Sequence, residues 1–229
     1  MDDLNELLRG IESAASYQAG IGVAVREFVR RMRFVETLDE MLEWDAKQCQ
    51  LSPGTRIMAM VMAILEDRRA LFRMPEVYAY KDVELLLGEG VRADWLNDKA
   101  LARALDKLQA ADARRVYSSI CLQAMATYEV VAERLHADTT SVSVYGRYPE
   151  EGSVDITFGF SKDHRPDLRQ FKVGATVTDE GIPITGDVFD GNRADQKWNA
   201  DLLRWLQTFM APERRPAWSS RPVRRPQHS

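Results

Sequence analysis

As far as about residue 134, the apolar positions of the chain recur three and four residues apart, which is the spacing of amphipathic helices. Ser52 followed by Pro53 predicts a helix start, because serine caps a helix and proline fits its first turn. Asn97 predicts a second start, and a long helix is expected over residues 112–134. The apolar stripes that carry this prediction are Leu4, Leu7, Leu8 and Ile11; Val25, Phe28, Val29 and Met32; Ile57, Val61, Met62 and Leu65; and Leu101, Leu105 and Leu108.

The pattern changes near Leu135, where β-branched residues become frequent and a strand is expected up to about Gly146. Residues 171–178 alternate between apolar and polar, as in a half-covered strand, and Asp179-Glu180-Gly181 predicts a turn into a strand over 182–189. Residues 194–210 return to helical spacing. The predicted fold class is therefore α+β, with an all-helical N-terminal half followed by three strands and a helix.

Asp138 is the one acidic residue inside the first predicted strand, LHADTTSVSVYGRY. A buried carboxylate is costly unless a charged partner meets it, so the position suggests a metal ligand or an acid–base group. The alternative is an aspartate at a strand edge that bonds to Thr139 or Thr140.

Five phrases, in this order, resemble the DDE transposases of bacterial insertion sequences, in the group whose core opens with a D-T-T-S strand. They are LSPGTRIMAMVMAILEDRRALFR, DVELLLGEGVRADWLNDKALARALDKL, LHADTTSVSVYG, GFSKDHRPDLRQF and GIPITGDVFDGNRADQK, and they span about residues 38–198. The resemblance implies a helical N-terminal domain over 1–134 that recognises DNA ends. It also implies a partial RNase H-like core over 135–212, with three strands and one helix. In such a sheet the first strand is central, with the second on one side and the fourth on the other.

The same resemblance implies Mg²⁺-dependent cutting and joining of DNA strands. Two divalent ions about 3.5–4 Å apart activate the nucleophile and stabilise the leaving oxygen in such chemistry. Asp138 matches the first of the family's three carboxylates, so it is the predicted catalytic metal ligand. The motifs that carry the second aspartate and the glutamate are not matched. Asp190 and Asp195 are read instead as a turn residue and a helix cap.

A basic cluster follows the first strand, and its four members, Lys162, His164, Arg165 and Arg169, are the predicted DNA contacts. Lysine and arginine bind phosphate whatever the base sequence. The alternative is a charged loop that ties itself down through a pair such as Arg165–Asp167. A helix-turn-helix over residues 91–108 is a weaker candidate, because a solvated helix face explains its cations equally well.

The last segment, residues 213–229, is rich in arginine and proline and shows no strand or helix pattern after Met210. It is expected to be disordered or read out of frame, which would make the chain a truncated, catalytically incomplete copy. A genuine basic tail that binds DNA is the alternative. The expected functions are therefore those of an enzyme by family, a non-catalytic DNA-binding or oligomerising fragment that regulates intact transposases, or a decayed product without activity.

Composition narrows the setting of these functions. The net charge of −4 does not indicate a general DNA-binding protein, so any DNA surface must be a local patch. No run approaches the roughly 18–20 apolar residues of a membrane span, and the N-terminus does not read as a signal peptide. Cys49 and Cys121 are expected to be buried thiols. A cytoplasmic protein without membrane contact is therefore predicted. The resemblance implies Mg²⁺ as cofactor and DNA terminal repeats as partner, and a second copy of the chain is a further expected partner.

Overall fold

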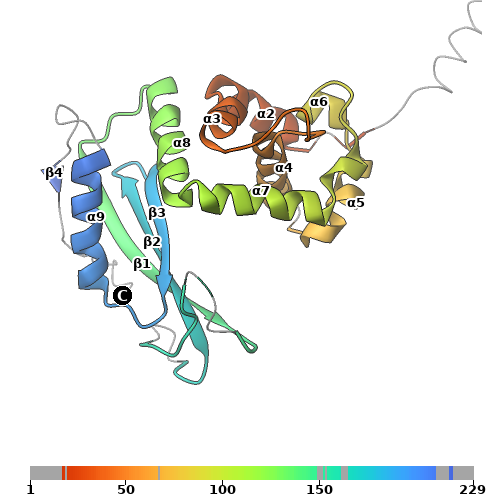
Figure 1. Cartoon of the computed structure of the whole chain (residues 1–229). Helices are drawn as coiled ribbons and strands as arrows, with labels where there is room; N and C mark the ends of the chain where they lie inside the picture. The colour runs from red at the N-terminus through yellow and green to blue at the C-terminus, as the bar shows by residue number, and fades with distance from the viewer. Residues whose placement is uncertain are drawn as a thin grey trace, which may run out of the picture. The chain divides into compact units, whose positions relative to one another are not determined.

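The computed structural model describes residues 17–18, 20–66, 68–148, 152, 154–160, 165–209 and 217–218. The chain divides into two compact units, Met1–Val116 and Tyr117–Ser229, called here the helical unit and the sheet unit. The fold class is α+β, as the sequence predicts (Figure 1). The division falls at Val116, whereas the change of periodicity along the sequence falls at Leu135.

The described part of the helical unit consists of helices and their connections. Its elements are α2 (Gly22–Arg31), α3 (Phe34–Met41), α4 (Pro53–Glu66), the 3₁₀ helix η1 (Leu71–Arg73), α5 (Met74–Ala79), α6 (Val83–Leu87), the 3₁₀ helix η2 (Ala93–Leu96) and α7 (Asp98–Ala110). The next helix, α8 (Ala113–Thr127), begins in the helical unit and continues into the sheet unit.

Both predicted helix starts are confirmed. The Ser52 hydroxyl accepts a hydrogen bond from the Thr55 amide at 3.1 Å, and the Asn97 side chain accepts one from the Ala100 amide at 3.0 Å. The helix predicted over 112–134 is present but shorter than expected, because it spans only Ala113–Thr127. Asp112 and Glu129 both adopt positive φ, at 63° and 55°, which isolates α8 from α7 and ends it at Thr127.

The core of the helical unit lies around α4. Met58, Met60 and Met62 are buried and fill this core. Leu65 and Leu105 belong to the apolar stripes of the sequence but are not buried, since these side chains are 56% and 40% exposed. On α7 the buried positions are instead Ala100, Leu101 and Ala104, because small alanines let the neighbouring helix approach closely.

The sheet unit contains the three predicted strands and the predicted helix, at nearly the expected bounds. They are β1 (Arg134–Val144), β2 (Arg169–Thr178), β3 (Pro183–Asp190) and α9 (Asp195–Phe209). Strands β1, β2 and β3 are antiparallel, and the order across the sheet is β3-β2-β1-β4. The two-residue strand β4 (Ala217–Trp218) pairs in parallel with Arg134 and Leu135 of β1.

Strand β4 lies where the sequence predicted no strand. A two-residue pairing depends on backbone hydrogen bonds alone, so it needs none of the alternation by which longer strands are recognised. The predicted tail, residues 213–229, otherwise lies outside the described residues.

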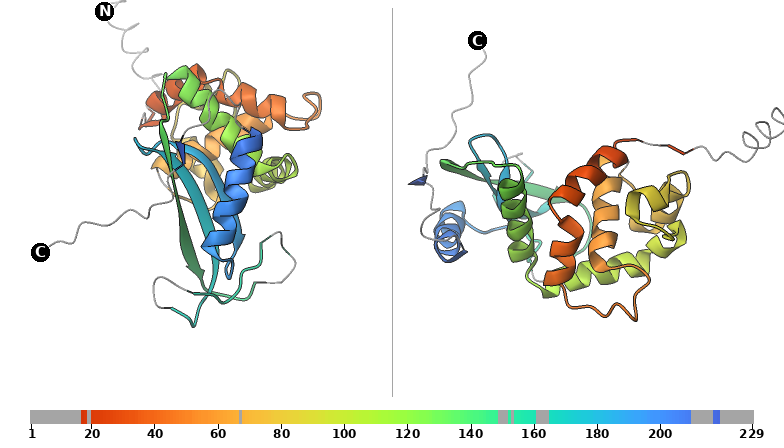
Figure 2. Two further views of the ribbon diagram at one scale, coloured as in Figure 1. Left: turned by 90° about the vertical axis from the view of Figure 1, so that its left-hand side faces the viewer. Right: turned by 90° about the horizontal axis from the view of Figure 1, so that it is seen from above.

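Helix α9 covers one face of the sheet (Figures 1 and 2). Trp198, buried to 1% exposure, stacks on Phe189 of β3 with ring centroids 5.9 Å apart. Gly174 of β2 lies under the same indole, since a Cβ atom there would fall 2.4 Å from Trp198 Cζ2. The remaining apolar core around this contact consists of Met125, Leu135, Ile184, Leu202 and Leu206.

Among the described residues, no helix combines the length and the apolar character that crossing a bilayer requires.

Candidate functional site

Asp138 lies at the middle of β1, opposite Ala175 of β2, which in turn lies opposite Gly186 of β3. Its neighbour Thr139 pairs with Gly174, the residue beneath the indole of α9. Because successive side chains of a strand point to opposite faces, Asp138 points away from α9. Its side chain is exposed, so the cost of burial inferred from the sequence does not apply. The Thr139 amide donates to Asp138 Oδ1 at 2.8 Å, which is the bond that the alternative interpretation of the sequence expected.

Asp138, Ala175 and Gly186 form a row across the three strands, on the face of the sheet away from α9. Ala175 and Gly186 are small, so little side-chain bulk covers the sheet beside Asp138. The ring of Tyr117, from α8, lies at the far end of this row, 3.4 Å from where a Cβ atom of Gly186 would be. Burial, together with the nearby Cys121 thiol, raises the pKa of Tyr117 to about 12. Burial also raises the pKa of Cys121. At neutral pH both groups therefore stay protonated, so the row carries one charged group, the Asp138 carboxylate, and a neutral phenol.

A single carboxylate does not make a site for two metal ions. In the part of the chain that the structure describes, no group of three or more histidine, cysteine, aspartate or glutamate side chains could hold a metal. Asp190 Oδ1 accepts from the Asp155 amide at 2.8 Å, and Asp195 pairs with Lys172 at 3.0 Å. Both carboxylates therefore bind groups of the protein near the ends of β2 and β3.

Of the predicted DNA contacts, Lys162 and His164 lie outside the described residues. Arg165 holds Asp167 in a two-pronged ion pair, with bonds of 2.9 and 2.8 Å, and also donates to the Tyr145 hydroxyl at 3.4 Å. The Arg165–Asp167 pair anticipated from the sequence is therefore confirmed. Its hydrogen bonds lower the pKa of Asp167, so the pair persists at neutral pH.

Arg169 begins β2 close to the same loop. Its guanidinium donates to the Tyr148 carbonyl at 3.1 Å and lies 5.7 Å from the centre of the Phe158 ring. One face of an arginine is thus packed on an aromatic ring, in the geometry of a cation–π contact.

Sequence reasoning missed exposed aromatic residues near the start of β2. Tyr145 and Phe158 contact the two arginines, and the Phe160 carbonyl accepts from Gln170, the neighbour of Arg169. Tyr145, Phe158 and Phe160 are 72%, 55% and 83% exposed. Exposed rings beside arginines are a surface on which single-stranded nucleic acids can stack. The signal was available in the phrase TFGF, where two phenylalanines alternate with small residues just before the basic cluster.

Asp138 and the aromatic–arginine cluster (Tyr145, Phe158, Phe160, Arg165 and Arg169) lie at different points of the sheet. Arg169 pairs with Val144, six residues along β1 from Asp138. At the usual rise per residue the two positions are about 20 Å apart. The predicted metal ligand and the predicted DNA contacts therefore lie at two separate places on the sheet.

The helix-turn-helix prediction over residues 91–108 is wrong. The element before Asn97 is the four-residue 3₁₀ helix η2, too short to act as the first helix of that motif. Arg92 pairs with Asp94, and Lys107 donates to the Glu43 carbonyl at 2.6 Å.

Comparison with known proteins relates the helical part of the chain to one family. Residues 20–122 match the model of a domain of unknown function (DUF4277). No curated protein and no solved structure matches the chain. The similarity therefore covers the described helical unit and the first part of α8, and the sheet unit is interpreted from its own geometry.

Proposed function

We propose that this chain is a transposase-derived protein that binds the DNA ends of an insertion element through its sheet unit. The observation that carries the proposal is the order β3-β2-β1-β4, with β1 inside the sheet and β4 parallel to it after α9. This is the arrangement expected of the start of an RNase H-like core. Asp138 lies at mid-strand on the β1 of that arrangement, where the resembled family carries its first carboxylate.

The aromatic–arginine cluster supports DNA as the ligand. Arg165 and Arg169 are already fixed, by Asp167 and by Phe158, at positions next to exposed rings. Rings held beside cations suit a DNA end whose terminal bases are unpaired, since phosphates meet the arginines while bases stack. In an acidic protein such a local patch is the form that DNA binding must take.

We propose binding without strand cleavage as the activity of this chain. Two-metal strand cleavage needs several carboxylates around the ions, and no group of three or more potential metal ligands occurs among the residues that the structure describes. The motifs for the family's other two carboxylates are not matched by the sequence. As a binder of element ends the protein would act in the cytoplasm, where bacterial DNA lies, with a second copy of the chain as a further partner.

The first test is DNA affinity. Duplexes with frayed ends, taken from the inverted repeats on either side of the gene, are titrated by fluorescence anisotropy. Arg165→Ala is expected to weaken binding at every sequence and to lower the slope of log affinity against log salt by about one, the loss of one phosphate contact. Phe160→Ala is expected to cost about 1–3 kcal/mol on frayed ends through lost stacking, and little on blunt duplex.

Lys197→Ala is the matched control, since Lys197 is an exposed cation on α9, outside the cluster. Its affinity should equal that of the unmodified protein. Equal losses in Arg165→Ala and Lys197→Ala would mean that the net charge, and not the cluster, decides binding, and the proposed interface would be wrong.

The second test is strand cleavage with Mg²⁺ on the same DNA. We expect no product above background from the unmodified chain. Cleavage that disappears in Asp138→Ala would overturn the non-catalytic proposal and make Asp138 a catalytic residue. Asp187→Ala, a carboxylate on the α9-facing side of β3, is the control for loss of charge alone.

A further inference from the structure

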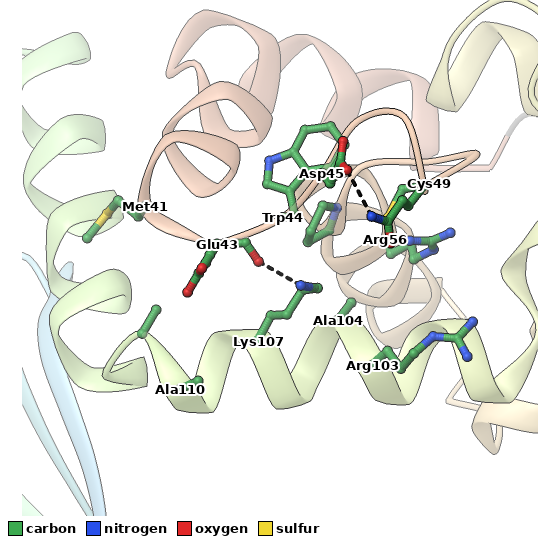
Figure 3. Close-up of a pocket in the computed structure, with 13 residues that line it drawn as sticks. Met41, Glu43, Trp44, Asp45, Cys49, Arg56, Arg103, Ala104, Lys107 and Ala110 are labelled. Atoms are coloured by element: carbon green, nitrogen blue, oxygen red, sulfur yellow. Dashed lines mark hydrogen bonds between the residues drawn. The ribbon is translucent and has the colours of Figure 1, made fainter.

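A cavity of about 840 Å³ lies in the helical unit, between α4, α7 and the segment that joins α3 to α4 (Figure 3). This volume is within the range of about 300–1,000 Å³ typical of small-molecule sites. The lining includes three cations, Arg56, Arg103 and Lys107, and the indole of Trp44. The proposed DNA interface uses no part of it.

Arg56 is the informative member of this lining. It is a helix residue of α4 with 9% exposure, and its Nε atom is buried without a hydrogen-bond partner. None of the side chains that the structure describes forms an ion pair with it. An arginine stays charged at any pH that a protein experiences, so burying it without an anion is costly. Arg56 lies on the wall of a cavity, so the best explanation for its charge is an anionic ligand that binds in that cavity.

Two further cations reach the same cavity from α7. Arg103 and Lys107 are four residues apart, which places them on one face of that helix. Lys107 is oriented by its bond to the Glu43 carbonyl, while Arg103 has no bond to a described side chain. In Figure 3 the guanidinium groups of Arg56 and Arg103 extend to the same side of the view.

Two carboxylates also line the cavity, and they set the balance of charge. Asp45 is engaged with its own loop, since it accepts from the Lys47 amide and from Gln48 Nε2, each at 2.9 Å. Glu43 is exposed. Three cations against two carboxylates leave the cavity positive, and the cation with the least water around it, Arg56, has no counter-charge.

We propose that this cavity binds the phosphate group of a nucleotide, with Arg56 and Arg103 as the phosphate ligands. Guanidinium groups meet phosphate oxygens in a two-pronged geometry, which suits an anion larger than a halide. The cavity is much larger than a phosphate ion, and Trp44 supplies an aromatic surface for a base. The indole is itself held by a bond from Nε1 to the Asp39 carbonyl at 3.1 Å. The nucleotide is either free or part of a DNA strand.

The test uses the full chain, with inorganic phosphate and adenosine 5′-monophosphate as probes at matched ionic strength. Both probes are expected to raise the Tm of the unmodified protein, because they bind the folded state. Arg56→Met keeps the bulk of the side chain and removes the charge. It is expected to weaken binding of both probes at least tenfold by calorimetry, while its own Tm without ligand is equal to or above that of the unmodified protein.

Arg92→Met is the matched control, since Arg92 is an exposed arginine of the helical unit that pairs with Asp94 outside the cavity. It should respond to both probes like the unmodified protein. A Tm that falls in Arg56→Met while probe binding is unchanged would show that Arg56 is structural, and the proposal would be wrong. Absence of any Arg56-dependent binding, by either probe or by DNA, would also overturn it.

Titration of the DNA ends distinguishes the two sources of the nucleotide. An affinity for DNA that falls in Arg56→Met identifies a nucleotide of the strand. An unchanged affinity, with binding of the monophosphate lost, identifies a free nucleotide. Binding of the monophosphate does not depend on the aromatic–arginine cluster. The cavity proposal can therefore fail while the proposed DNA interface holds, and the reverse.

Discussion

Replacing Gly174 with alanine is expected to destabilise the sheet unit by about 1–3 kcal/mol, the usual cost of adding a methyl group to a packed core. The added carbon would fall 2.4 Å from Cζ2 and 2.5 Å from Cε2 of Trp198. The indole has little room to move, because it is buried to 1% exposure and stacked on Phe189. The strand can move away only by weakening its pairing with β1.

Ala175→Val is the matched control for this prediction. It also adds methyl groups to β2, but at the next residue, which is exposed on the opposite face. Valine favours strands, so a change within about 0.5 kcal/mol is expected. Urea unfolding followed by tryptophan fluorescence measures both variants. Equal destabilisation by the two would mean that the faces of the sheet are assigned wrongly, and with them the direction in which Asp138 points.

The strands could be predicted from the sequence because their alternation is local, but the covered face could not. In residues 171–178 the apolar set is Phe171, Val173, Ala175 and Val177, and alternation alone places these inward. In the structure the face toward α9 is instead the set with Lys172, Gly174 and Thr176. Glycine there makes room for the indole, a requirement that comes from a helix more than 20 residues later in the chain.

The candidate site divides in the same way. The Arg165–Asp167 pair was predictable because its members are two residues apart. The separation of Asp138 from Arg169 was not, because it depends on the register between β1 and β2. The unpaired Arg56 could not be found from sequence either, since an arginine in a helix normally reaches solvent, and only the packing around α4 buries it.

Leu101→Ala is expected to destabilise the helical unit by about 2–5 kcal/mol, the range for truncating a fully buried leucine. Leu101 has no exposed surface, and it lies on the face of α7 that also buries Ala100 and Ala104. Alanine keeps the helix propensity, so the loss is one of packing and of the cavity left behind.

Leu105→Ala makes the same chemical change one turn later, at a side chain that is 40% exposed. A loss below about 1 kcal/mol is expected, because less apolar surface returns to water. The apolar stripe in the sequence predicts equal losses at Leu101 and Leu105, whereas the structure predicts a much larger loss at Leu101. Comparing the two variants therefore tests the structure against the sequence pattern. Thermal and urea unfolding followed by circular dichroism measure the difference. Similar losses at both positions would show that α7 packs on a broader face than the buried set Ala100, Leu101 and Ala104.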